Sequence, residues 1–385
     1  MISQPPALVI GGELNGLGVC RSLAQAGIKT YVLDNKWHQA ALWSRYAIPI
    51  KADAIYGSRL LSALHKLDLP EHTELIITDE MAVYTISEYR ADLAFRIHLP
   101  PHDMVLTLQD KALFHKFATT HGLPVPNAVI LGNEAEVSSI RDLRFPVVIK
   151  PADKQDHYIK RVSRIVLAHD PQQAMIACRK ILKTIQQVIV QECIEGPDSD
   201  IYFCLFYRKD NITKAMFTGR KLVSIPPGTG STGFCVGVPP GDLRAQLENL
   251  TEKFIVLSNY VGLGSVEYKW DTRAARFLII EPTVGRTDWQ EEIATLSGTN
   301  IPVIGYCEEC NLPIPASKRN PGVVWQQSYI DRIRAGLGKI PRKATIVDGY
   351  WRWNDPIPAL IHYPFAIMQL FRGAVHCFRG ALKHS

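Results

Sequence analysis

The pattern of apolar and polar positions in residues 7–100 alternates between two kinds of segment. Short apolar runs at 7–10, 30–34 and 74–78 are each followed by residues whose apolar positions recur at helical spacing. Strands that alternate with helices in this way are typical of βαβ units with a parallel sheet. The pattern therefore predicts an α/β domain with βαβ units at the start of the chain.

The following two hundred residues have a different pattern, in which apolar strands end in charged groups. The run 145–149 ends in Lys150, and the run 188–190 leads into a polar turn over 191–198. An ammonium at the mouth of a buried sheet is suited to a phosphate, and the turn can present backbone groups to a base. An amphipathic helix is predicted over 243–257, and Asp110 is a suitable N-cap for the helix that carries Lys111. These elements predict an α+β domain.

Two later strands, about one hairpin apart, each carry a glutamate. Glu267 lies in the run 266–269, and Glu281 ends the run 277–280. We expect both carboxylates to point into the same space. Mg²⁺ binds one or two carboxylates together with phosphate oxygens, so the pair predicts a magnesium–nucleotide site, with Arg286 facing the transferred charge. An edge hairpin with two solvated glutamates is the alternative.

In this order, the motifs make the chain resemble the ATP-grasp superfamily, specifically its carboxylate–amine ligases, which include D-alanyl-D-alanine ligase, biotin carboxylase and carbamoyl-phosphate synthetase. The resemblance covers roughly residues 105–310. It implies a Rossmann-like pre-ATP-grasp domain at 1–104 and an α+β ATP-grasp domain at 105–315, with a lid subdomain at about 125–195. Residues 316–385 would then form a C-terminal extension, partly apolar and basic.

The resemblance also implies a role for each matching residue, with ATP and Mg²⁺ (or Mn²⁺) as cofactors. Lys111 and Lys150 would contact the phosphates, and Arg286 would act at the transferred group. Glu192 and Ile194 would bind adenine through their backbones. The full set of implied ATP-binding and metal-binding residues is Lys111, Lys150, Gln191, Glu192, Ile194 and Asp198 for ATP, and Glu267, Glu281 and Thr283 for the metal.

Three features depart from the family pattern. Thr283 stands where the family usually has asparagine, and a hydroxyl is a weaker ligand for Mg²⁺. The loop 152–160 carries charged side chains where glycines are usual, and Arg286 lies one residue further from Thr283 than the usual step. A catalytically silent ATP-binding module is therefore kept as an alternative to an enzyme.

Several further residues are candidates for contact with substrates. Arg220 or Lys221 can face a phosphate, or form a solvated surface pair. Gly12 and Asn15 lie at a helix N-terminus suited to a carboxylate. Asp79 and Glu80 follow a strand end and can recognise an amine, or simply complement a helix dipole. Asp288 can orient an acceptor amine, or be an ordinary solvated residue.

Glycines at 12, 16 and 18, with Asp34 at the end of the second strand, offer a rival interpretation. They approximate a dinucleotide-binding fingerprint, although the spacing is not that of G-x-G-x-x-G. An NAD-dependent oxidoreductase is therefore a second alternative. Otherwise the glycines only allow a tight turn at the head of the sheet.

Composition narrows the remaining choices. The chain has 385 residues, 46% hydrophobic and 21% charged, with a net charge of +6, which is ordinary for a globular protein of two or three domains. The basic residues are dispersed, so no nucleic-acid partner is expected. The N-terminus lacks a basic leader and predicts a cytoplasmic protein whose eight cysteines stay reduced. Cys307 and Cys310 have the spacing of a metal or redox pair, but no further zinc ligands accompany them.

The C-terminal region is apolar from residue 356 onward and carries Arg372, Arg379 and Lys383. It is too broken to span a membrane. Two alternatives stay open: docking on the protein's own surface, and peripheral contact with the inner membrane face. A homodimer is also left open.

Together these observations predict an ADP-forming, ATP-dependent ligase that joins a small carboxylate to an amine through an acyl phosphate. An amino acid, a peptide or a surface-polysaccharide precursor is the expected kind of substrate.

Overall fold

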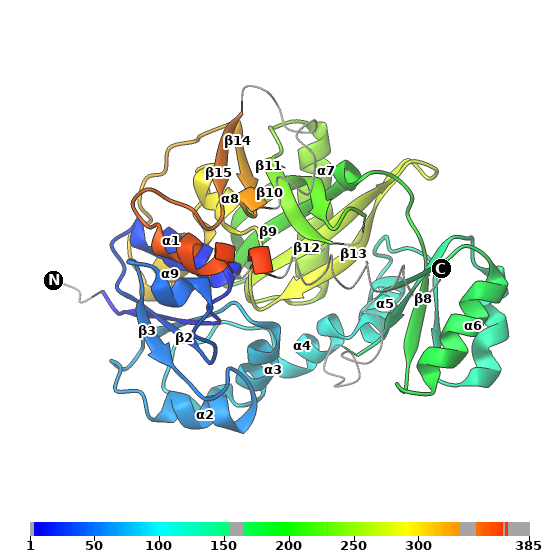
Figure 1. The fold of residues 1–385 in the computed structure, drawn as a ribbon, viewed down its shortest axis with the longest axis horizontal. Coiled ribbons are helices and arrows are strands. Elements are labelled where there is room, and N and C mark those ends of the chain that lie inside the picture. Colours follow the sequence, from blue (N-terminus) through cyan, green and yellow to red (C-terminus); the bar gives the residue numbers. More distant parts are fainter. Residues whose placement is uncertain (1–3, 154–164, 229, 331–343, 365, 369–385) are drawn as a thin grey trace.

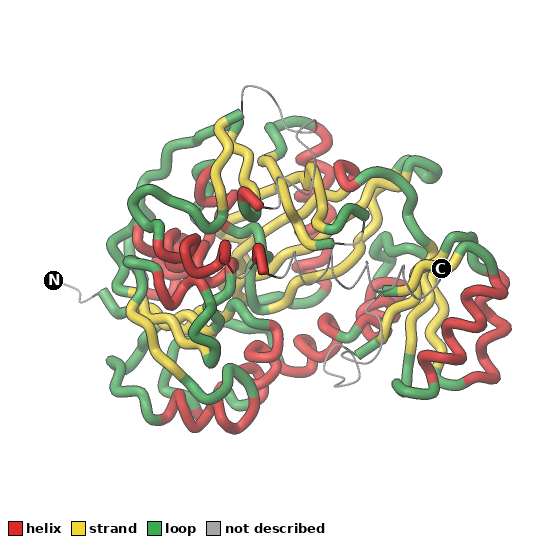
Figure 2. The backbone as a smooth tube through the Cα atoms, in the orientation of Figure 1, coloured by secondary structure: helices red, strands yellow, loops and turns green. Residues whose placement is uncertain are grey.

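The computed structural model describes residues 4–153, 165–228, 230–330, 344–364 and 366–368, and its strands form three sheets (Figure 1). In Figure 2 the strands gather in three groups, with helices packed beside each. The predicted fold class is confirmed, because a parallel α/β sheet precedes two largely antiparallel sheets.

The N-terminal sheet, blue in Figure 1, has four parallel strands in the order β3-β2-β1-β4. Its strands are β1 (Ala7–Ile10), β2 (Thr30–Asp34), β3 (Ile48–Lys51) and β4 (Glu74–Ile77). Its helices are α1 (Leu14–Ala24), η1 (Ala40–Trp43), α2 (Gly57–His65), α3 (Glu80–Glu88) and η2 (Arg90–Asp92). The side chains of β1 alternate between a core shared with α1 and a core shared with α2 and α3, so helices cover both faces.

The central sheet has seven strands in the order β13-β12-β9-β10-β11-β14-β15. Their bounds are β9 (Ile201–Lys209), β10 (Ile212–Ile225), β11 (Ser231–Gly237), β12 (Gly262–Asp271), β13 (Arg276–Val284), β14 (Val323–Gln326) and β15 (Thr345–Asp348). The helices of this region are α7 (Asp242–Leu257), α8 (Glu292–Leu296) and α9 (Ile301–Cys310). Along β9, Tyr202, Cys204 and Phe206 pack in the core shared with α7, whereas Phe203, Leu205 and Tyr207 pack in the core shared with α9.

The third sheet, at the right of Figure 1, is antiparallel with the order β5-β8-β6-β7. Its strands are β5 (Ala128–Leu131), β6 (Val147–Pro151), β7 (Val166–Ala168) and β8 (Val188–Glu192). The helices η3 (Glu134–Asp142) and α6 (Pro171–Leu182) pack on it around a core of their own. The connection from the N-terminal domain is made by α4 (His102–Gln109) and α5 (Lys111–Thr120). Asp110 caps α5 as predicted, accepting a 2.7 Å hydrogen bond from the Leu113 backbone.

The predicted C-terminal extension contains β14 and β15, which belong to the central sheet. Beyond β15, the helical residues 357–364 bring Tyr363 against the sheet, where its hydroxyl donates to Asp348 at 2.8 Å. The basic residues Arg372, Arg379 and Lys383, and most of the predicted lid loop at 152–160, lie outside the described residues. No helix in the described part of the chain is long and apolar enough to cross a membrane.

Candidate functional site

A cleft of about 880 Å³ lies between the small third sheet and the central sheet. One side is formed by β6, β7 and β8, and the other by β10, β12 and β13. Eleven of the candidate residues named from the sequence line it, namely Glu80, Lys111, Lys150, Gln191, Glu192, Ile194, Lys221, Glu267, Glu281, Thr283 and Arg286. The structure thus brings together residues from the two predicted domains.

The two predicted metal carboxylates are direct cross-strand neighbours. Glu267 on β12 pairs with Glu281 on β13 in the antiparallel register, and Ser265 pairs with Thr283 two residues along. Because side chains of a strand alternate between faces, these four residues share one face of the hairpin. The register shifts directly after Glu267, where Tyr268 pairs with Ile279. Such a bulge re-aims side chains at a site.

Lys221, on β10, completes the group of charges. Its ammonium lies 2.6 Å from a carboxylate oxygen of Glu267, and the lysine is 6% exposed. Burial alone would lower the pKa of Lys221, but the carboxylates of Glu267, Asp288 and Asp198 outweigh it and raise that pKa. The surroundings of Lys221 therefore favour its charged form inside the cleft.

Two further lysines reach the cleft from the opposite side. The ammonium of Lys150, on β6, lies 3.4 Å from the side-chain oxygen of Gln191 on β8. Lys111 is the first residue of α5, and its backbone N–H donates to the Ala152 carbonyl at 3.0 Å. That hydrogen bond ties the start of α5 to the end of β6, which places the two lysines beside the same space.

Arg286 provides a test of whether an anionic ligand fits here. It lines the cleft just beyond β13, and its Nη1 donates to the Thr287 carbonyl at 3.2 Å. Its Nε is buried without a hydrogen-bond partner among the described residues. A buried guanidinium donor without a partner is costly unless a ligand meets it. With three lysines and two paired carboxylates around the same space, the donor set suits phosphate groups and a hard divalent cation.

Arg220 is placed differently from Lys221. Its guanidinium lies over the ring of Tyr202, 5.4 Å from the centroid, and donates to the Ser199 carbonyl. Successive side chains of β10 point to opposite faces, so Lys221 lines the cleft and Arg220 does not. The sequence did not favour one of the two residues over the other, whereas the alternation of side chains along β10 distinguishes them.

The side chains of two predicted nucleotide-binding acids have partners inside the protein. Asp198 accepts backbone hydrogen bonds from Ser224 at 2.9 Å and Gly228 at 3.1 Å, and both of these residues line the cleft. Its carboxylate therefore shapes a wall of the cleft. The carboxylate of Glu192 accepts from Asn127 at 3.2 Å and pairs with Arg144 at 3.2 Å. These side-chain contacts are compatible with the prediction that Glu192 would act through its backbone.

Most of the predicted substrate contacts also have partners within the fold. The Gly12 amide donates to Asp34 at 2.7 Å, and Asn15 exchanges two hydrogen bonds with Thr287, at 2.8 and 3.1 Å. Asp79 caps α3 by accepting from the Ala82 backbone at 2.9 Å. Burial raises the pKa of Asp79, against the opposing influences of the Ala82 amide and Arg286. Of this set only Glu80 lines the cleft.

Asp288 lies next to the two predicted metal carboxylates. Its two oxygens accept hydrogen bonds from the hydroxyls of Thr283, at 2.5 Å, and Ser265, at 2.6 Å. The sequence assigned Asp288 to an acceptor amine, but in the structure these two hydroxyls occupy its oxygens. Strand spacing alone gave no sign of this contact, because Asp288 reaches it from the loop after β13.

The NAD interpretation lacks its key contact. Asp34, the carboxylate that would hold the ribose, is fully buried and accepts from the backbones of Gly12 at 2.7 Å and Lys36 at 2.8 Å. The hydrogen-bonding groups of the glycine-rich turn and of the Asp34 carboxylate are therefore paired with each other.

The described residues contain no group of three or more His, Cys, Asp or Glu side chains that could hold a metal ion. This includes the region of Cys307 and Cys310.

The chain is similar in fold to several enzymes of known structure. It matches N5-carboxyaminoimidazole synthetase from Staphylococcus aureus with a TM-score of 0.63 and 13% identity, over 82% of this chain and 80% of that one. It matches the biotin carboxylase domain of the 2-oxoglutarate carboxylase of Hydrogenobacter thermophilus, in complex with MgADP, ADP and bicarbonate, with a TM-score of 0.64 and 13% identity. That match covers 83% of this chain and 73% of the other.

In sequence, the chain is 34% identical over 88 residues to an uncharacterised protein of Sinorhizobium fredii. The match spans 23% of this chain and 24% of that protein. No protein-family model matches the chain.

Proposed function

Because the chain has the ATP-grasp fold, we propose that it is an ADP-forming, ATP-dependent ligase that joins a small-molecule carboxylate to an amine through an acyl phosphate. One observation carries the proposal: Glu267 and Glu281 are paired across two strands, beside the buried ammonium of Lys221, in a cleft with room for a nucleotide. A pocket of several hundred cubic ångströms with a few convergent charged groups is the usual form of such a site.

The position of each residue in the cleft suits it to a different role. Glu267, Glu281 and Thr283 would hold Mg²⁺, which when bound offsets the charge of the phosphates. Lys111 and Lys150 approach the phosphates from the side of the small sheet, and Lys221 approaches from the central sheet. The three ammonium groups neutralise the anionic nucleotide and orient its terminal phosphate towards the substrate carboxylate.

Arg286 is suited to the reacting end of the nucleotide. Its Nε, which has no hydrogen-bond partner in the described part of the chain, lies on the side of the cleft where Asp79 and α3 of the N-terminal domain are nearby. A guanidinium there stabilises the negative charge that develops on the transferred phosphoryl group and on the acyl phosphate when the amine attacks. Glu80, which lines the same cleft, is suited to hold the amine.

The proposal is tested by incubating the protein with Mg²⁺-ATP and pools of amino acids and small carboxylates in the presence of hydroxylamine. An acyl phosphate is trapped by hydroxylamine as a hydroxamate, so a ligase gives both ADP and hydroxamate with one pool only. Omission of hydroxylamine, followed by addition of amine pools, then identifies the natural acceptor. Peptides and surface-polysaccharide precursors are the next pools to test.

The silent ATP-binding module predicts a different result. It would bind ADP and ATP with Mg²⁺ but release no ADP with any pool. Tight nucleotide binding without hydroxamate or phosphate release across all pools would therefore favour that alternative over the ligase.

A further inference from the structure

Asp288 forms a compact hydrogen-bonded group directly behind the metal carboxylates. Its Oδ1 accepts from the Thr283 hydroxyl at 2.5 Å, and its Oδ2 accepts from the Ser265 hydroxyl at 2.6 Å. Ser265 and Thr283 are cross-strand partners, two residues along from Glu267 and Glu281. The Gln290 amide also donates to Oδ2, at 3.4 Å. A single carboxylate thus fixes the hydroxyls of both strands of the hairpin.

The two hydroxyls differ in what they can reach. Thr283 lines the cleft, whereas Ser265 is 1% exposed and does not. A hydroxyl has one proton to donate and two lone pairs that can accept. Since the proton of Thr283 is directed to Asp288, the lone pairs are the part of this hydroxyl that can meet a ligand in the cleft. An oxygen held in this way is suited to a cation and not to an acceptor group.

We propose that Asp288 is a positioning residue that holds the Thr283 hydroxyl as the third protein oxygen for the divalent cation. This inference rests on the proposed function, because it requires the cation to bind at Glu267 and Glu281. An amide or carboxylate oxygen carries no proton and needs no such support, whereas a free hydroxyl can rotate its proton towards the cation. Asp288 prevents that rotation and makes the oxygen more electron-rich.

Direct measurement of Mn²⁺ binding tests the inference without relying on turnover. Mn²⁺ is titrated into the protein with saturating ADP, and free Mn²⁺ is followed by electron paramagnetic resonance. Asp288→Asn retains the shape but replaces one acceptor oxygen with a donor, so it should weaken Mn²⁺ binding by about tenfold, as loss of a partner behind a metal ligand typically does. Thr283→Val should weaken it by at least as much.

The decisive comparison is the effect of Asp288→Asn on Mn²⁺ affinity in proteins that differ at position 283. Because Asp288 is proposed to act through Thr283, adding Asp288→Asn to Thr283→Val should cause no further loss of Mn²⁺ affinity. In a Thr283→Asn protein, whose amide oxygen needs no support, Asp288→Asn should also have little effect. Thr107→Val is the matched control, because Thr107 is a half-buried residue of α4 that does not line the cleft, and its hydroxyl donates to the Asp103 carbonyl at 2.8 Å.

The outcomes separate the two proposals. Wild-type Mn²⁺ affinity in Asp288→Asn, or equal losses from this change in all backgrounds, would overturn the positioning role while leaving the ligase intact. If the unaltered protein bound no Mn²⁺ with ADP, or if Glu281→Gln bound it unchanged, the proposed metal site itself would be wrong and the inference would fall with it. Thermal unfolding and metal-free ADP affinity identify any variant that has lost its fold.

Discussion

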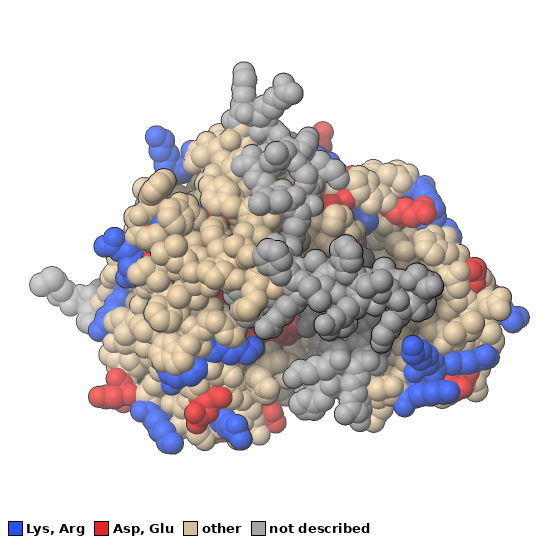
Figure 3. All heavy atoms as spheres, viewed as in Figure 1, with Lys and Arg blue, Asp and Glu red and all other residues tan. Residues whose placement is uncertain are grey.

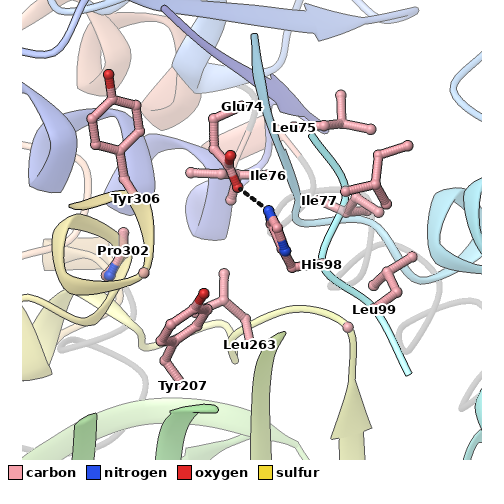
Figure 4. Close-up of a pocket in the computed structure, with 13 residues that line it drawn as sticks. Glu74, Leu75, Ile76, Ile77, His98, Leu99, Tyr207, Leu263, Pro302 and Tyr306 are labelled. Carbon is pink, nitrogen blue, oxygen red and sulfur yellow. Dashed lines mark ion pairs between the residues drawn. The ribbon is translucent and has the colours of Figure 1, made fainter. Parts of the chain in front are cut away.

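Two regions of the molecule bring carboxylates and cations together, and they differ in the space around those groups. In the cleft of about 880 Å³, Glu267 and Glu281 lie beside Lys221. In the second region, Glu74 and Glu309 lie close to His98 beside a cavity of about 20 Å³. Figure 4 shows the Glu74 and His98 side chains pointing toward one another at this cavity. The cleft has room for a nucleotide, whereas the small cavity has room for about one water molecule.

The second region joins parts of the fold to one another. His98 Nε2 lies 3.5 Å from Glu74 on β4 and 3.1 Å from Glu309 on α9. Lys209, at the end of β9, lies 3.1 Å from Glu309, and the Tyr207 hydroxyl donates to the same carboxylate. These contacts link the N-terminal sheet to the central sheet. We call this group of five residues the interdomain cluster.

The difference shows that residue types alone do not mark a functional site. Both regions contain acids and a lysine, but the side chain of Glu267 is 26% exposed, whereas that of Glu74 is 5% exposed. A carboxylate binds a metal in its ionised form. Contact with water and with an ammonium favours that form, whereas burial favours the neutral form. On the face shown in Figure 3, positive and negative side chains of the described residues are interspersed.

The largest expected effect comes from Glu281→Gln. Loss of a carboxylate that holds the metal should reduce Mg²⁺-dependent ADP release by about 100-fold or more, equivalent to about 3 kcal/mol of transition-state stabilisation. The free energy of unfolding should change little, because Glu281 lines an open cleft. Coupled-enzyme detection of ADP and a urea titration measure the two quantities. Unchanged ADP release would remove Glu281 from the site.

A second, smaller effect should separate neighbours on β10. Lys221→Met removes a charged group from the cleft and should lower kcat/KM for ATP by roughly 10- to 100-fold. Because the pKa of Lys221 is raised, this loss should be the same from pH 6 to pH 9. Arg220→Gln should change kcat/KM by less than about threefold, since Arg220 lies over Tyr202. Equal losses in the two variants would contradict the placement of these side chains.

The sequence predicted the parts of the cleft that depend on local pattern. Glu267 and Glu281 were found because two strands one hairpin apart have a simple relation in space, and Lys150 because it ends an apolar run. The register of β12 and β13 could not be predicted, since the shift after Glu267 depends on an unpaired residue in β13. Arg220 and Lys221 could not be ranked, because alternation shows that neighbours differ but not which face meets the cleft.

Contacts between distant segments were also beyond the sequence. Asp288 was assigned to an amine, and its bonds to Thr283 and Ser265 depend on how the loop after β13 folds back. Asp34 was a possible ribose ligand until the structure placed it against Gly12. The interdomain cluster gave no signal at all, because Glu74, His98 and Glu309 belong to elements far apart in the chain and no periodicity links them.

Glu309→Gln should produce the opposite result to Glu281→Gln. The change removes the charge that faces Lys209 and His98 and weakens the acceptor of the Tyr207 hydroxyl. Loss of a buried charged partner should lower the free energy of unfolding by about 2 kcal/mol, while ADP release should stay within about twofold. A urea titration and the ADP assay measure both. If Glu309→Gln lost turnover without losing stability, the distinction between the two regions would fail.

The smallest effect is a pH dependence in the interdomain cluster. Burial raises the pKa of Glu74 above 4.5, although His98 and Arg96 oppose the change and Glu309 adds to it. A raised pKa in the folded state stabilises the fold fully below pH 4.5, and this contribution is lost as pH rises through the folded-state value. Glu74→Gln cannot ionise, so its stability relative to the wild type should increase above pH 4.5, by at most about 1.4 kcal/mol per pH unit.

Urea titrations from pH 4 to pH 8 measure this difference, with the exposed Glu71→Gln as the matched control. The series is repeated in a His98→Gln background, because His98 lies 3.5 Å from Glu74 and opposes the rise in the pKa of Glu74. A difference between Glu74→Gln and wild type that stayed constant with pH in both backgrounds would show that Glu74 is ionised in the fold. The interdomain cluster would then resemble the cleft in its charge, and the size of the cavity would be the main remaining difference between the two regions.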